Sequence, residues 1–163
     1  HGRFRPWLVE ACPLSSDTLG SMKYFRQAHV VYHTQYHIVW IPRFRRKWMN
    51  KGIARFLELK LDEVRKWYPD LHFQERNIQP DHIHLLLVVP PRWSVSKAVN
   101  ILKTNTSRAL KKEFPFLSKL YADNGGIWSV GYFVSTVGIN EAIIRRYIKF
   151  QEKEDSGQAK LAL

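Results

Sequence analysis

The sequence predicts an α+β fold, in which helices cover one face of an antiparallel sheet. Three observations predict it. The 163 residues, 45% of them hydrophobic, are enough for one domain with a real core. Apolar residues alternate in four segments and recur at helical spacing in three others. No apolar run approaches the roughly 20 residues that span a bilayer.

The first half of the sequence contains three predicted strands and one helix. Residues 30–41 are rich in aromatic and β-branched residues and end at Pro42, which predicts a strand. Residues 53–68 place apolar side chains on one helical stripe, from Ile53 to Trp67 and Tyr68. Residues 71–79 and 81–89 then form two strands. The short link at Pro80 predicts a hairpin, so these two strands should be antiparallel.

The second half adds two helices and a strand. Ser94 is a suitable cap for a helix whose buried stripe runs from residue 95 to residue 110. The Asp-Asn-Gly-Gly run at 123–126 predicts a turn, and residues 128–137 a fourth strand. Gly138 breaks that strand. The last helix is predicted to begin after its cap Asn140, where Ile139 and Ile144 occupy the positions of a hydrophobic staple, and to carry Gln151.

The element order is therefore strand, helix, strand, strand, helix, strand, with one helix appended. This order is the split βαβ, or ferredoxin-like, βαββαβ arrangement. In it, the first and third strands are neighbours at the centre of the sheet.

The ends of the chain differ in character from the body. His1, and Gly20-Ser21 directly before Met22, predict that residues 1–21 are an expression-tag or vector segment. We expect a single domain over residues 22–155 and a polar tail at 156–163.

The only cysteine is Cys12, so the body offers neither a disulfide nor a cysteine-based metal site. With no targeting signal recognised, we expect a cytoplasmic protein.

The net charge of +12 favours nucleic acid as the partner over a membrane surface. A basic loop at 43–48 places Arg43, Arg45 and Arg46 beside the rings of Phe44 and Trp48. Guanidinium groups bind phosphates and exposed rings stack on bases, so we favour contact with nucleic acid there. The alternative is a solvated loop whose rings fold back on the core.

A second basic surface is predicted on the helix at 95–110, opposite its buried stripe. Lys103 and Arg108 belong to it, together with Lys97 and Lys111. The sequence leaves open whether this surface faces phosphates or only solvent.

Two histidines occupy one face of the third predicted strand. Side chains alternate along a strand, so His82 and His84 point the same way and Ile83 points into the opposite layer. Paired imidazoles on a rigid strand suit a divalent metal, although hydrogen-bonded histidines at a sheet end are an equally good interpretation of this spacing alone. His37, on the neighbouring strand, is close enough in the topology to approach the pair. The sequence leaves open to which face of the sheet its side chain points.

The last predicted helix carries Tyr147 and Gln151, four residues apart and so on one face. A single tyrosine at such a position is more often part of the core. Together with His82 and His84, these residues indicate a site in which two imidazoles and a side-chain oxygen hold a divalent ion beside a nucleophilic hydroxyl.

The order and spacing of these segments resemble those of the small single-tyrosine transposases of bacterial and archaeal insertion sequences, which belong to the His-hydrophobic-His (HUH) nucleases. The resemblance covers nearly all of residues 32–151. It rests on Tyr36-His37-Ile38-Val39-Trp40, Pro80-Asp81-His82-Ile83-His84-Leu85-Leu86, Leu102-Lys103, Trp128-Ser129-Val130-Gly131-Tyr132-Phe133 and Tyr147-Ile148-Lys149-Phe150-Gln151.

The resemblance implies that Mg²⁺ or Mn²⁺ is held by His82, His84 and Gln151, and that the last helix carries the catalytic tyrosine. Tyr147 would attack the scissile phosphate of single-stranded hairpin DNA and form a 5′-phosphotyrosine intermediate, which is later rejoined for excision and insertion of the element. It also implies a prokaryotic enzyme that acts as a homodimer, with the tyrosine helix acting in trans.

Two alternatives remain at this stage. One is a monomeric relative with the same chemistry that processes repeated hairpins. The other is a ferredoxin-like module that binds single-stranded nucleic acid without catalysis, which would leave His82, His84, Tyr147 and Gln151 without a role.

Overall fold

A computed structural model describes residues 25–123, 125–136 and 141–157, with the backbone alone at 141–143. The predicted tag at 1–21, and Gly138, Ile139 and Asn140, lie outside the described residues. The strands are β1 (Phe25–Gln27), β2 (Val30–Tyr32), β3 (Gln35–Trp40), β4 (His72–Gln79), β5 (His82–Val88) and β6 (Phe133–Ser135). The helices are the 3₁₀ turn η1 (Arg43–Arg45), α1 (Lys51–Trp67), α2 (Val95–Glu113), α3 (Pro115–Leu120) and α4 (Glu141–Asp155).

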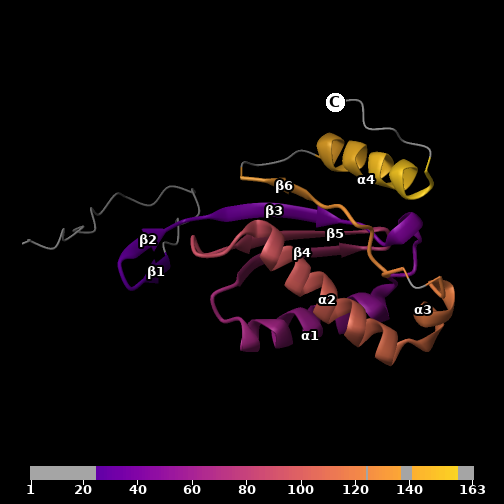
Figure 1. Ribbon diagram of the computed structural model, residues 1–163, viewed down its shortest axis with the longest axis horizontal. Coiled ribbons are helices and arrows are strands. Elements are labelled where there is room, and N and C mark those ends of the chain that lie inside the picture. Colours follow the sequence, from indigo (N-terminus) through magenta and orange to yellow (C-terminus); the bar gives the residue numbers. More distant parts are fainter. Residues whose placement is uncertain (1–24, 124, 137–140, 158–163) are drawn as a thin grey trace, which may run out of the picture.

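The main sheet has the strand order β4-β5-β3-β6, and each neighbouring pair is antiparallel. Helices α1 and α2 lie on one side of it, and α4 lies on the other side (Figure 1). The predicted ferredoxin-like arrangement is confirmed, including the central pairing of β3 with β5 and the appended helix.

The core lies between the sheet and the α1–α2 layer. Ile83, Leu85 and Leu87 of β5 are completely buried there. They pack with the apolar stripes of α1 and α2, including Leu57 and Leu102. Because strand side chains alternate, His82 and His84 must lie on the other face of β5, beneath α4.

Two strand predictions are wrong in extent. The segment 30–41 is divided, because β2 pairs with β1 in a separate hairpin whereas β3 pairs with β5. The predicted strand at 128–137 is reduced to β6, preceded by a single bridge between Trp128 and Pro42. In the segment before β6, the carbonyl groups of Ser129 and Gly131 accept hydrogen bonds from the ammonium of Lys103, at 2.8 and 2.7 Å.

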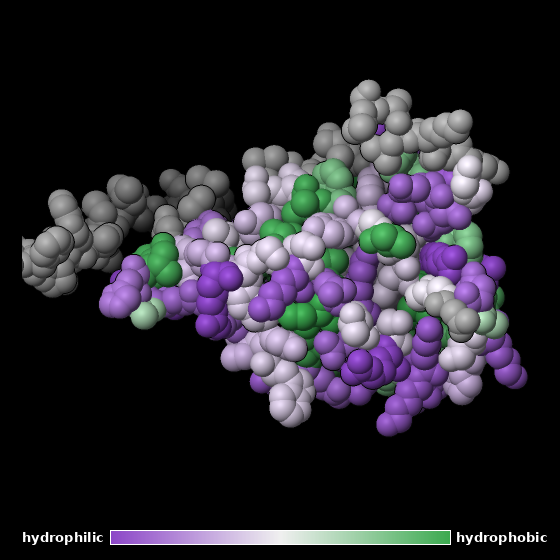
Figure 2. Space-filling model, in the orientation of Figure 1, coloured by the Kyte–Doolittle hydropathy of each residue, from purple (hydrophilic) through white to green (hydrophobic). Residues whose placement is uncertain are grey.

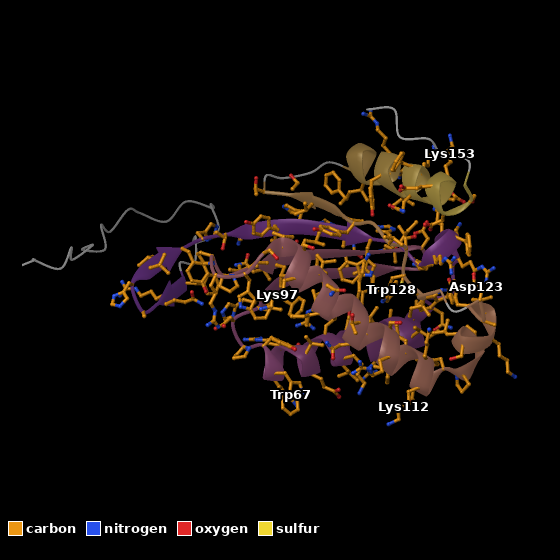
Figure 3. The ribbon with its side chains drawn as sticks, viewed as in Figure 1. Trp67, Lys97, Lys112, Asp123, Trp128 and Lys153 are labelled. Carbon is orange, nitrogen blue, oxygen red and sulfur yellow. The ribbon has the colours of Figure 1, made fainter. Side chains whose placement is uncertain are left out.

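Two helical features also differ from the expectation. Helix α3 was not predicted; it is a six-residue turn that begins at Pro115. Trp67 was placed on the buried stripe of α1, but 82% of its surface is exposed. It is the last residue of α1, and Figure 3 shows its side chain pointing away from the sheet. The rest of the stripe is confirmed, because Val64 is buried and Tyr68 is partly buried against the core.

The surface carries no large apolar patch on the face shown in Figure 2, where the green residues are separated by hydrophilic ones. Within the described residues, every helix is too short or too polar to cross a membrane.

Candidate functional site

A cavity of about 730 Å³ lies between the histidine face of β5 and helix α4. His82 and His84 both line it, so their imidazoles open onto one space, as their spacing predicted. The other lining residues are polar groups near the end of β4 and the start of β5, Arg45 from η1, and one face of α4: Asn77, Gln79, Asp81, Ile144, Arg145, Ile148 and Lys149.

Asp81 orients the ring of His82. Its Oδ1 lies 2.8 Å from Nδ1 of His82, and its Oδ2 accepts a hydrogen bond of 3.1 Å from Nε of Arg45. Burial raises the pKa of the Asp81 carboxyl, but the bonds to His82 and Arg45 outweigh it and bring the pKa below its usual range. An ionised carboxylate can only accept, so Nδ1 of His82 carries a proton, and in the neutral ring Nε2 is the nitrogen left to bind a cation.

A third imidazole completes the histidine cluster. Nδ1 of His37 lies 3.1 Å from Nε2 of His84, so one of these nitrogens donates to the other. The β3–β5 register places Val39 opposite His84, which makes His37 its diagonal neighbour. Burial, followed by the charges of His37 and His82, lowers the pKa of His84. A neutral imidazole is the form that binds a cation.

The chemistry of the histidine pair fits a divalent cation. His82 offers Nε2, and His84 offers its other ring nitrogen when its Nε2–H donates to His37. Imidazole ligands suit transition-metal ions such as Zn²⁺ better than Mg²⁺, which prefers oxygen. Over the described ranges, no three His, Cys, Asp or Glu side chains are arranged to hold a metal. Within these ranges a further protein ligand would be of another residue type, such as the Gln151 amide.

Tyr147 and Gln151 lie together on α4, but they are not among the described residues that line the histidine cavity. The Tyr147 hydroxyl donates to Oε1 of Gln151 at 3.5 Å, and its ring packs against Phe133 of β6. Gln151 is buried; its Nε2 donates to Oδ1 of Asp155, and a Cβ atom at Gly131 would collide with its Oε1. Within one chain, Tyr147 is thus beside Gln151, and His82 and His84 share the cavity. The described lining of that cavity includes neither Tyr147 nor Gln151.

The environment of Tyr147 keeps its hydroxyl protonated. Burial raises its pKa, and the carboxylates of Asp155 and Glu154 raise it further, to well above the usual range. A phenol in this position is a poor nucleophile. Attack by this oxygen would require positive charge near the hydroxyl to stabilise the phenolate.

The sequence comparisons agree on one family. The family model of IS200-like transposases matches residues 30–151. The chain belongs to the IS200-like transposase family. It is 36% identical over 136 residues to the transposase of insertion sequence element IS200 from Salmonella typhimurium, covering 83% of this chain and 88% of the relative.

A second curated relative and a solved structure agree with this assignment. The ISDra2 transposase TnpA of Deinococcus radiodurans is 29% identical over 127 residues, which cover 77% of this chain and 89% of the relative. The crystal structure of a Deinococcus radiodurans R1 protein assigned as a transposase superposes with a TM-score of 0.68 at 26% identity. That match covers 78% of this chain and 97% of the other.

The aromatic rings in the basic loop of this transposase fold back on the core. Trp48 is buried and donates from Nε1 to the Tyr121 hydroxyl, and Phe44 is partly buried. The expectation of exposed rings is therefore wrong for Trp48. Arg43 pairs with Asp123, and Arg46 donates to the carbonyl of Leu120. Their contact with DNA, and that of Arg45, stays a prediction.

The second basic surface forms a groove. Two adjoining cavities of about 410 and 490 Å³ run along α2 and share Asn100, Lys103 and Val130 in their walls. Arg108 lines the larger cavity, whereas the ammonium of Lys103 is directed at the carbonyls of residues 129–131. Lys103 thus fixes the segment against which Gln151 packs, and its contact with DNA stays a prediction.

Three residues of the site were not identified from the sequence. Asp81 was quoted only as part of a motif, and the facing of His37 could not be fixed before the strand register was known. No role was predicted for Asp155, yet it contacts Gln151, Ser129 and the amide of Phe44. An acidic residue four positions after Gln151 was the available signal, because i,i+4 residues share a helix face.

The buried ammonium of Lys103 predicts a pH dependence of stability. Burial lowers its pKa from 10.5 to about 8, against the opposing effect of Asp155. Between these values the unfolded chain binds more protons than the folded one, so Lys103 should make the free energy of unfolding rise with pH from about 8 towards 10.5. Urea unfolding of the native protein and the Lys103→Met variant checks this. The native protein should gain stability relative to the variant across that window; a difference independent of pH would contradict it.

Proposed function

We propose that this transposase cuts and rejoins single-stranded DNA by a metal-dependent transesterification, in which Tyr147 is the nucleophile and His82, His84 and Gln151 are the metal ligands. The excised element would carry hairpins near its ends. The observation that supports this most directly is the pair of imidazoles that open onto one cavity beneath α4, with an ionised Asp81 behind His82.

The reaction conserves the number of phosphoester bonds. The Tyr147 hydroxyl loses its proton as its oxygen forms a bond to phosphorus, and the bond from phosphorus to the 3′-oxygen breaks. The 3′-oxygen takes up a proton, so no net proton is gained or lost. This leaves a 5′-phosphotyrosine and a free 3′-hydroxyl. A cation held by the two imidazoles would polarise the scissile phosphate as a Lewis acid. Attack by a second 3′-hydroxyl reverses the first step and restores the tyrosine, so rejoining needs no ATP.

The separation of the two residue pairs supports a homodimer in which the tyrosine helix of one subunit serves the other's histidines. In one chain, Tyr147 packs against Phe133 while the histidine cavity is lined by Ile144 and Ile148. Either α4 moves on its own chain, or the α4 of a second copy brings its phenol to the cavity. We favour the second, because the family resemblance implies it and Gly138 precedes the helix.

The groove along α2 is the surface that we assign to the DNA strand. Its walls supply amide, hydroxyl and cationic groups at successive turns of the helix, and no carboxylate is among its described lining residues. The polar members are Ser94, Ser96, Lys97, Asn100, Lys103, Thr104, Ser107, Arg108, Lys111 and Ser129. This composition suits a phosphate backbone.

The chemistry predicts a covalent adduct. Incubation of the protein with labelled single-stranded hairpin DNA and Mn²⁺ should give a protein–DNA species that survives a denaturing gel and maps by mass spectrometry to Tyr147. Tyr147→Phe should abolish the adduct because it removes the attacking oxygen. Tyr68→Phe, at a second partly buried tyrosine that lines neither the histidine cavity nor the groove, is the matched control and should retain it. Binding of the DNA without any adduct would favour the non-catalytic module instead, and an adduct on another residue would overturn the assignment of Tyr147.

The trans arrangement predicts complementation between two inactive variants. A mixed dimer of Tyr147→Phe and His82→Ala subunits contains one site with intact histidines from the first subunit and an intact phenol from the second. Cleavage should therefore reappear on mixing, up to about half of the sites in each mixed dimer. If mixed preparations stay as inactive as either variant alone, the helix acts within its own chain.

A further inference from the structure

The turn η1 is held in an unusual backbone conformation. Phe44 and Arg45 are consecutive non-glycine residues with φ values of 61° and 52°, in the left-handed region that side chains disfavour. Such a conformation persists only where the surroundings fix it, and it is frequent at functional sites. Here the surroundings include the C-terminal end of α4, because the amide N–H of Phe44 donates to Oδ2 of Asp155 at 3.0 Å.

The side chain of Arg45 joins α4 to the histidine site. Its NH1 donates to Oε2 of Glu152 on α4 at 2.8 Å, and its Nε donates to Oδ2 of Asp81 at 3.1 Å. The second oxygen of Asp81 lies 2.8 Å from Nδ1 of His82. One guanidinium and one carboxylate thus form a continuous path from the tyrosine helix to the ring of His82.

The charge of this cluster argues against Arg45 as a direct phosphate contact in this arrangement. Asp81, Arg45 and Glu152 together carry one net negative charge, so the guanidinium is already neutralised. The neighbouring Arg46 differs, because it donates to a backbone carbonyl and lies over the rings of Phe44 and Tyr121. Arg45 is the member of the basic loop that contacts both the helix and the histidine site.

We propose that Arg45 is a positioning residue that couples docking of α4 on η1 to the orientation of Asp81 and, through it, of His82. The inference rests on the proposed function, since it assumes that His82 binds a cation. Glu152 holds one arm of the guanidinium fork, which fixes the other arm on Asp81. Asp81 then keeps the proton on Nδ1 of His82 and its Nε2 directed into the cavity. A helix that leaves η1 removes the first of these constraints.

The geometry requires the planar fork as well as the charge. Arginine donates from Nε and NH1 in fixed directions, whereas lysine is a single point charge that cannot bridge two carboxylates in the same way. Arg45→Lys should therefore break the coupling while it keeps the charge. Arg46→Lys is the matched control, since it makes the same exchange at the next residue without contact to Asp81 or Glu152.

The test measures Mn²⁺ affinity by titration calorimetry and the hydrogen exchange of α4 amides by mass spectrometry, on the full chain. Arg45→Lys should weaken Mn²⁺ binding about tenfold, as expected when the partner of a ligating histidine is disturbed. It should also speed the exchange of α4. Arg46→Lys should change neither.

If docking of α4 and cation binding are coupled, a change at either site must affect the other, whereas local damage affects only the site that is changed. Glu152→Gln, on the helix, should weaken Mn²⁺ binding at histidines that it does not touch. Asp81→Asn, behind the histidine, should speed exchange in α4. Glu154→Gln removes the same charge from the same helical turn and should leave Mn²⁺ affinity unchanged.

The outcomes distinguish this inference from the proposed function. If the native chain binds Mn²⁺ and forms the adduct, but Arg45→Lys equals Arg46→Lys in both measurements, the coupling is overturned and the function stands. The coupling is likewise overturned if Glu152→Gln leaves Mn²⁺ affinity unchanged, or if Asp81→Asn leaves the hydrogen exchange of α4 unchanged. If the native chain neither binds Mn²⁺ nor forms the adduct, the proposed function itself has failed.

Discussion

The alternation of side chains along β5 is the constraint on which the rest of the structure depends. Ile83, Leu85 and Leu87 are completely buried against the α1–α2 layer, so the register of this central strand cannot slip without moving apolar groups into solvent. The same register fixes His82 and His84 on the opposite face. The apolar core therefore holds the imidazoles in place, and the strand pairing with β3 brings His37 beside them.

Helix α4 is attached through polar contacts as well as apolar ones. Ile148 and Gln151 are buried, and Asp155 and Glu152 bind the η1 turn through Phe44 and Arg45. Hydrogen bonds and ion pairs of this kind exchange with water at little net cost, so they hold α4 less firmly than an equal number of buried apolar contacts would. The protonated, buried state of Tyr147 is consistent with a resting arrangement.

Much of the fold followed from the sequence because periodicity reports burial directly. The four strands of the sheet, the helices α1, α2 and α4, and the shared face of His82 and His84 were all predicted. Features that depend on partners distant in sequence were not. The division of residues 30–41 between β2 and β3, the bonds from Lys103 to the carbonyls of Ser129 and Gly131, and the contact of His37 with His84 depend on the strand register. The role of Arg45 depends on two carboxylates that lie 36 and 107 residues away.

The central claim is that the face shared by His82 and His84 binds a divalent cation. Anomalous diffraction from crystals soaked in Mn²⁺ tests it most directly, because the signal locates the ion without reference to activity. The account predicts a peak in the cavity beneath α4, within bonding distance of Nε2 of His82 and of a ring nitrogen of His84. A cavity without such a peak, in crystals whose manganese sites lie only on surface carboxylates, would contradict it.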